Sequence, residues 1–247
     1  MTIDALAFLP TPRAAGGSSP VAAVLGEMAR FGIDRTILCA GGPSGDEGGE
    51  DAVLAAVAAH PDRLVALLRC NPTHPAWHNE LQRRAGTGGV VGIFLHPFED
   101  GYSVLDPRTV ALVEAAGSIP LPVVVAAGYP WVAEPLQIGS LAERFRTTSF
   151  VLTNEGQLNI SGLGTTDVSL LLGATANVYL HMTGAYREDF LATLLSRHGA
   201  QRLMYASQSP RFNRALELRR IEWLPGAPDA ARQQMLAGTA TTVFSLQ

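Results

Sequence analysis

Short runs of β-branched and other apolar residues alternate along the chain with longer segments rich in alanine, leucine and arginine. The short runs predict buried strands, and the longer segments predict helices that cover them. The expected strands are Ile3–Leu9, Arg35–Cys39, Leu64–Cys70, Gly89–Leu95, Pro122–Ala126, Ser149–Asn154, Asn177–His181 and Arg202–Tyr205. The expected helices are Pro20–Phe31, Asp51–His60, Pro75–Arg84, Pro107–Ala116, Leu136–Arg144, Asp167–Leu172, Arg187–Arg197, Arg211–Trp223 and Asp229–Leu236.

Residues that begin helices support this division of the chain. Ser19 precedes Pro20 as an expected N-cap, and Asp106 precedes Pro107 in the same way. Repeated alternation of strand and helix predicts parallel strands that are covered by helices. Eight such units predict the α/β class, with a closed (β/α)8 TIM barrel that forms a single domain over residues 1–247.

Composition narrows the classes of partner. The chain has 247 residues, a net charge of −4 and no cluster of lysine and arginine, so we expect no nucleic-acid partner. The longest apolar runs, such as Leu121–Ala127, are too short to span a bilayer, and no basic segment precedes the first apolar stretch. We therefore expect a cytoplasmic protein with no membrane partner. Cys39 and Cys70 each end a strand and are expected to be buried, reduced thiols.

Eight phrases, in order along the chain, resemble the amidohydrolase-related family, in the branch that includes decarboxylases and lactonases of small aromatic and carboxylic acids. The phrases are FGIDRTIL, HPDRLVALLRCNP, GVVGIFLHP, PVVVAAG, FVLTNEG, NVYLHMTG, GAQRLMYASQSP and TATTVFSL. Together they cover nearly the whole chain, and the resemblance implies the barrel fold a second time.

The resemblance also implies where metal ligands would lie. The family's first strand carries His-x-His, because residues two apart on a strand share a face and reach one metal ion. Leu6 and Phe8 stand at those positions here. Ala126 and Asn154 take the places of histidines at the ends of the fifth and sixth strands, and Gln208 replaces the aspartate after the eighth. The resemblance therefore implies neither a metal site nor any other cofactor.

Polar residues remain at several strand ends. His96, Asn154, His181 and Gln208 are the predicted ligand-binding residues, with Asn71 and Glu155 completing a polar rim. A hydrogen-bonded rim without a ligand is the alternative for each of them. His96, His181 and Glu155 are also residue types that bind zinc or iron, but they lie on three strands and the spacing does not show that they meet.

Three functions fit this sequence. With its expected metal ligands replaced, the chain is expected to be a non-catalytic partner or regulatory subunit, in a homo- or hetero-oligomer with an active amidohydrolase relative. The first alternative is a metal-independent hydrolase, lactonase or decarboxylase-like enzyme that acts on a small carboxylated or aromatic compound. The second is a barrel that binds a small-molecule ligand without chemistry. No Gly-x-Ser-x-Gly or Gly-x-Gly-x-x-Gly motif is present.

Overall fold

A computed structural model of the chain describes residues 1–12, 15–16, 19–41, 49–157, 163–185 and 187–246. The strands are β1 Ile3–Phe8, β2 Arg35–Cys39, β3 Leu64–Arg69, β4 Val90–Leu95, β5 Val123–Val125, β6 Phe150–Leu152, β7 Val178–His181 and β8 Leu203–Met204. The α-helices are α1 Pro20–Phe31, α2 Gly49–Ala59, α3 Trp77–Ala85, α4 Pro97–Asp100, α5 Pro107–Ser118, α6 Pro135–Arg144, α7 Leu163–Ala174, α8 Glu188–His198, α9 Arg214–Glu222, α10 Asp229–Gln233 and α11 Thr239–Val243. Short turns of other helical types are η1 Asn154–Gly156, η2 Ala200–Arg202 and η3 Gln234–Gly238.

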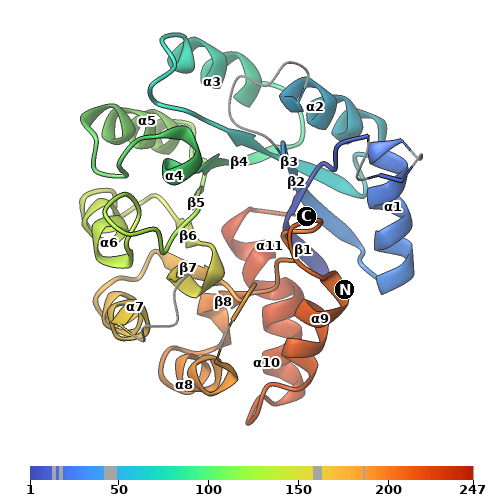
Figure 1. Cartoon of the computed structure of the whole chain (residues 1–247), viewed down its shortest axis with the longest axis vertical. Helices are drawn as coiled ribbons and strands as arrows, with labels where there is room; N and C mark the ends of the chain where they lie inside the picture. The colour runs from blue at the N-terminus through green and yellow to red at the C-terminus, as the bar shows by residue number, and fades with distance from the viewer. Residues whose placement is uncertain (13–14, 17–18, 42–48, 158–162, 186, 247) are drawn as a thin grey trace.

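The eight strands form one parallel sheet in chain order, β1 to β8. Figure 1 looks along the barrel, with the strands around the centre and the helices outside them. Backbone hydrogen bonds close the circle: the Ala5 N–H donates to the Tyr205 carbonyl at 3.0 Å, and the Gln208 N–H donates to the Leu6 carbonyl at 2.7 Å. The predicted (β/α)8 barrel is confirmed.

Local signals in the sequence begin and end the helices as expected. The Ser19 hydroxyl accepts a hydrogen bond from the Ala22 N–H at 3.2 Å, which caps α1 ahead of Pro20. Gly32, with a φ of 63°, ends the same helix in the left-handed region that glycine adopts without strain. None of the helices in the described part of the chain is long and apolar enough to cross a membrane.

Strand residues alternate between two apolar layers. Along β4, Ile93 and Leu95 pack toward the helices, whereas Phe94 belongs to the cluster inside the barrel. Phe244, in the segment that follows α11, also belongs to the inner cluster, together with Ile3 at the start of β1. The C-terminal helices therefore close the end of the barrel where the strands begin.

Several element boundaries differ from the predictions. The last helical stretch was expected to end at Leu236, but it continues through η3 and α11 to Val243, because Ala240 and Val243 are buried inside the barrel. The short helix α4 follows His96 and was not predicted. In α7, the helix begins at Leu163 and not at Asp167.

Both cysteines are buried and free, as expected. Cys39 belongs to the cluster inside the barrel, whereas Cys70 packs in the outer layer. Burial raises the pKa of both thiols well above the usual value, so neither forms a thiolate near neutral pH.

Candidate functional site

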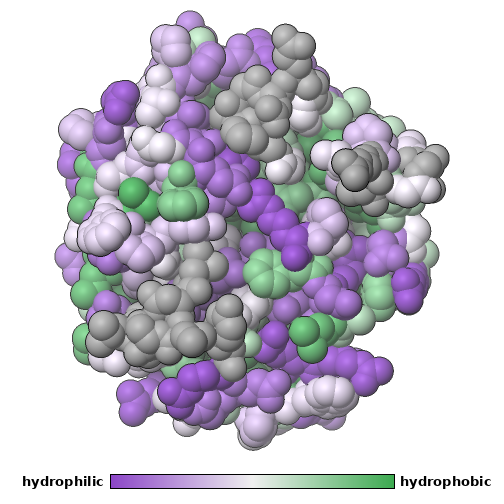
Figure 2. All heavy atoms as spheres, viewed as in Figure 1, coloured by the Kyte–Doolittle hydropathy of each residue, from purple (hydrophilic) through white to green (hydrophobic). Residues whose placement is uncertain are grey.

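Polar side chains gather where the strands end, at the face of a (β/α)8 barrel that carries ligand sites. Arg69 ends β3, His96 follows β4, and His181 ends β7. Each of them is two residues beyond an interior residue or contacts one, so all three face the inside of the barrel. Figure 2 shows hydrophilic residues across the middle of the face that Figure 1 looks onto.

His181 is completely buried at this end of the barrel, with an exposed fraction of 0%. Its neighbours Leu180 and Met182 pack in the outer layer, while Tyr179 packs against the inner cluster, so the His181 ring faces the interior. Neither ring nitrogen has a hydrogen-bond partner among the described residues. Burial lowers the pKa of His181 to about 3, which makes the ring neutral at neutral pH. A buried polar group left in this state costs about 1–3 kcal/mol.

Asn154 and Gln208 lie beyond the ends of the two strands that flank β7. The Gln208 side-chain amide donates to the Asn154 side-chain oxygen at 3.3 Å. Asn154, Glu155 and Gln208 all have positive φ values, of 54°, 56° and 47°. A residue other than glycine held there costs about 1–3 kcal/mol, and such strain is concentrated at functional sites. The structure therefore brings Asn154 and Gln208 together beside the strand that ends in His181.

Glu155 is buried next to Asn154, with an exposed fraction of 1% and one carboxylate oxygen, Oε2, without a partner. Burial raises its pKa to about 9; the positive charge of Arg220 opposes this rise, and the negative charge of Glu217 adds to it. Glu155 is therefore a neutral carboxylic acid at neutral pH, able to donate a proton.

His96 lies in a charged network on the opposite side of the barrel mouth. Its Nδ1 accepts from the Glu99 N–H at 3.3 Å, which leaves the proton on Nε2, 3.2 Å from Glu99 Oε1. Burial lowers the pKa of His96 to about 4, although the Glu99 carboxylate acts in the other direction. Arg69 binds Glu99 at 2.7 Å and Asp100 at 3.1 Å. The interior end of β3 is thus a buried ion-pair network.

Arg211 extends from the loop after β8 across the barrel mouth. Its guanidinium lies 4.2 Å from the centre of the Phe8 ring, and Nη1 lies 3.0 Å from Glu99 Oε1. The Tyr129 ring is 5.4 Å from the His96 ring and stacks on Phe98 at 4.6 Å. A cation over an aromatic ring, held by one partly exposed carboxylate, suits an incoming anionic group of an aromatic compound.

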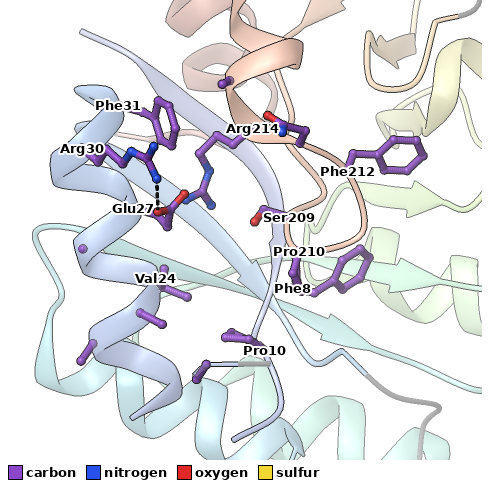
Figure 3. Close-up of a pocket in the computed structure, with 16 residues that line it drawn as sticks. Phe8, Pro10, Val24, Glu27, Arg30, Phe31, Ser209, Pro210, Phe212 and Arg214 are labelled. Carbon is purple, nitrogen blue, oxygen red and sulfur yellow. Dashed lines mark ion pairs between the residues drawn. The ribbon is translucent and has the colours of Figure 1, made fainter. Parts of the chain in front are cut away.

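A groove of about 600 Å³ lies outside the barrel, between α1 and the start of α9 (Figure 3). Its charged groups are mostly paired: Glu27 binds Arg30 at 3.5 Å, and Arg214 binds the buried Asp4 at 3.4 Å. None of the described residues that line it is a histidine or a cysteine. We therefore assign the candidate site to the barrel mouth.

The positions at which the resemblance implies metal ligands can now be located. Leu6, Phe8 and Ala126 face the interior of the barrel, and their side chains carry no atom that binds a metal ion. Within the described ranges, no three histidine, cysteine, aspartate or glutamate residues are grouped in a way that could hold one. His96, His181 and Glu155 are therefore not assembled into a metal site. The residues present do not fit the metal that the resemblance associates with this family.

Four residues of this site were not predicted from the sequence: Arg69, Glu99, Tyr129 and Arg211. Arg69 had a usable signal, because a lone arginine ends the apolar run LVALLR with interior parity. Glu99 and Arg211 directly follow strand-end phrases, but no spacing rule shows that Arg211 reaches across the mouth.

The fold and this site define a (β/α)8-barrel protein with a polar site where its strands end. The amidohydrolase family model matches residues 13–246, so the chain belongs to the amidohydrolase family.

Solved structures of similar fold include a probable 2-pyrone-4,6-dicarboxylic acid hydrolase from Acinetobacter baumannii, with a TM-score of 0.76, 16% identity and 99% of each chain covered. Another is 5-carboxyvanillate decarboxylase from Sphingomonas paucimobilis, with a TM-score of 0.72, 15% identity, and coverage of 100% of this chain and 99% of that one. A third is an amidohydrolase from Burkholderia multivorans with bound zinc, with a TM-score of 0.76, 16% identity and both chains fully covered. No curated protein matches the sequence.

These comparisons correct one expectation. We expected a non-catalytic partner of an active relative, because the implied metal ligands are replaced. The similar structures whose names state an activity are instead decarboxylases and hydrolases, and none of those reported above is a non-catalytic subunit. The expectation of a non-catalytic partner is therefore wrong. It inferred the loss of all catalysis from the replaced metal ligands alone.

Proposed function

We propose that this chain is an enzyme that hydrolyses or decarboxylates a small carboxylated compound at the mouth of the barrel. The observation that carries the proposal is His181, a buried interior imidazole whose two ring nitrogens have no hydrogen-bond partner in the part of the chain that the structure describes. The names of two similar proteins point in the same direction, because both state substrates with carboxyl groups.

In this proposal Arg211 binds a carboxylate of the substrate. The guanidinium is shared with Glu99 and is partly exposed, with a side-chain exposure of 31%, so an incoming carboxylate can replace Glu99 as its partner. The ring of Phe8 beneath it and the Tyr129–Phe98 stack beside His96 favour a flat, aromatic or ring-shaped body.

The chemistry is assigned to His181 and the residues around it. The neutral imidazole has one N–H donor and one acceptor nitrogen, so it can hold a substrate oxygen and transfer a proton. Asn154 and Gln208 offer amide groups to further polar atoms of the substrate. The residues at the implied ligand positions do not fit a metal ion, so the proposed chemistry is that of the chain's own side chains.

The test is product formation by the purified protein with a panel of carboxylated benzoic acids and 2-pyrone-4,6-dicarboxylate. Released carbon dioxide and ring-opened product are measured separately. We expect turnover of at least one compound and a loss of about 100-fold or more in kcat for His181→Ala, because a positioned acid or base contributes about 100- to 10,000-fold. His78→Ala, on the exposed surface of α3, is the matched control and should keep the wild-type rate. Turnover that is unchanged in His181→Ala would remove the assigned chemistry.

A further inference from the structure

A separate cavity of about 190 Å³ lies between α2, α3 and the end of β3. Its lining includes Glu50, Cys70, Asn71, His74, Trp77 and Arg84. Leu68 on β3 and Cys70, directly after it, line the cavity and pack in the outer layer, on the side away from the barrel interior. The cavity is smaller than the roughly 300–1,000 Å³ of sites for drug-sized ligands, so it suits a molecule of a few heavy atoms.

Glu50 is the unusual group in this cavity. Its Oε1 accepts a hydrogen bond from the Arg69 N–H at 3.0 Å. Its Oε2 is buried and has no hydrogen-bond partner among the described residues. A buried carboxylate oxygen without a donor is an open acceptor position in the wall of the cavity.

Glu50 forms no ion pair with any of the described residues, although the charge of Arg84 is near enough to act on it. Arg84, from α3, binds Asp51 at 2.9 Å and Glu80 at 2.9 Å, so two carboxylates already share its charge. The apolar part of the wall is formed by the ring of Trp77 and the side chains of Leu68 and Leu81. An aromatic and apolar wall beside an unpaired carboxylate complements a small cation that has an apolar body.

We propose that this cavity is a second binding site, which takes a small organic ammonium ion whose N–H group donates to Glu50 Oε2. The apolar body of the ligand packs between Trp77, Leu68 and Leu81. The site is independent of the proposed reaction. The two sites share only Arg69, whose backbone N–H donates to Glu50 and whose side chain lies in the barrel mouth.

The electrostatics of Glu50 set the pH dependence of this site. Burial raises its pKa to about 7; the Arg69 N–H and the charge of Arg84 oppose the rise, and Asp51 adds to it. The other groups that face it are Glu80 on α3, His74 in the preceding loop, and the Cys39 and Cys70 thiols, which stay neutral. An ammonium ion binds the ionised carboxylate, so binding should strengthen by about tenfold between pH 6 and pH 8.

Titration of the full chain with propylammonium chloride, followed by calorimetry at pH 6 and pH 8, tests the proposal. Sodium chloride at equal ionic strength and neutral 1-propanol are the ligand controls. We expect saturable binding of propylammonium alone, with the stated rise in affinity at pH 8. Because turnover is not measured, failure here would leave the proposed function untouched, and the reverse is also true.

Two variants locate the site. Glu50→Gln keeps an acceptor for the Arg69 N–H but removes the charge, and should weaken binding by about tenfold or more and abolish its pH dependence. Glu143→Gln removes one exposed carboxylate on α6 and should change neither. Trp77→Leu leaves Glu50 in place and should weaken binding with the pH dependence retained. The proposal is overturned if no saturable binding occurs, or if Glu50→Gln binds as wild type does.

Discussion

The polar nitrogens of the buried His181 ring contribute nothing favourable to the free energy of folding. Its two nitrogens are buried and meet no hydrogen-bond partner among the residues that the structure describes, and its neighbours on β7 supply the apolar packing. The imidazole is therefore expected to serve activity and not the stability of the fold. Replacing the imidazole with an apolar group of similar size removes the desolvation cost and keeps the filled space.

We therefore expect His181→Leu to raise the free energy of unfolding by about 1–3 kcal/mol while it abolishes activity. Urea denaturation followed by circular dichroism measures the change. A destabilised variant would mean that the ring has interactions that the structure does not contain.

Arg211 is expected to act in binding more than in chemistry. Arg211→Gln should raise KM by about tenfold and lower kcat by less than about threefold, because a contact made equally in the ground state and the transition state affects mainly KM. Steady-state kinetics on the compound that the panel identifies gives both constants. A large fall in kcat with KM unchanged would assign Arg211 to the chemical step.

The raised pKa of Glu155 should make the free energy of unfolding depend on pH. Its pKa is raised to about 9 in the folded protein, so between pH 7 and pH 9 the folded state holds a proton that the unfolded state has lost. The free energy of unfolding therefore falls as the pH rises, by about 1.4 kcal/mol per pH unit at most from Glu155. Unfolding free energies measured across this range should fall in wild type and fall less steeply in Glu155→Gln. Identical slopes in both proteins would show that Glu155 is ionised at neutral pH.

At the scale of elements, the first strand and the helix after the last strand are joined by one buried ion pair. Asp4 on β1 accepts from the Ser207 N–H at 2.7 Å and from the Ser207 hydroxyl at 2.6 Å, and it binds Arg214 of α9 at 3.4 Å. Figure 3 shows Arg214 extending from α9 into the groove beside Phe31 of α1. This pair ties together the two ends of the barrel sequence.

Asp4→Asn should destabilise the fold by about 3–5 kcal/mol, because it leaves the Arg214 charge buried without its partner. Asp34→Asn, which removes an exposed ion pair with the chain's amino group, should cost less than about 1 kcal/mol. Thermal unfolding of the two variants in parallel measures the difference. Equal effects would mean that Asp4 does not hold the barrel closed.

Sequence pattern predicted the elements well where periodicity and caps agree, as at α1 with Ser19 and Pro20. It failed where tertiary contacts override local preference. The Thr-rich segment of α11 is a poor helix by propensity and is held by burial of Val243 inside the barrel. Strand β6 ends at Leu152, two residues before its predicted end, because Asn154 adopts left-handed backbone angles.

The candidate site was predictable only in part, for a geometric reason. Residues two apart on a strand share a face, so the position of His96 and of His181 in the barrel interior follows from a single strand in each case. The contact between Asn154 and Gln208 needs the registers of two separate strands. The place of Arg211 over Phe8 needs the course of a loop and a long side chain. No pattern in the sequence determines either of these.

For the whole molecule, one end of the barrel is closed by the chain's own C-terminal helices and the other carries the polar residues. Membership of the amidohydrolase family and the fold agree with a site at the second end. Assembly into a homo- or hetero-oligomer stays a prediction, which sedimentation of the purified chain would test.

We propose above all that the barrel mouth is an active site that depends on His181. The most direct measurement is kcat/KM of the wild-type protein and of His181→Ala with carboxylated benzoic acids and 2-pyrone-4,6-dicarboxylate. We expect measurable turnover by wild type and a loss of about 100-fold or more in the variant. No turnover of any of these compounds by the folded wild-type protein, or equal turnover by both proteins, would contradict it.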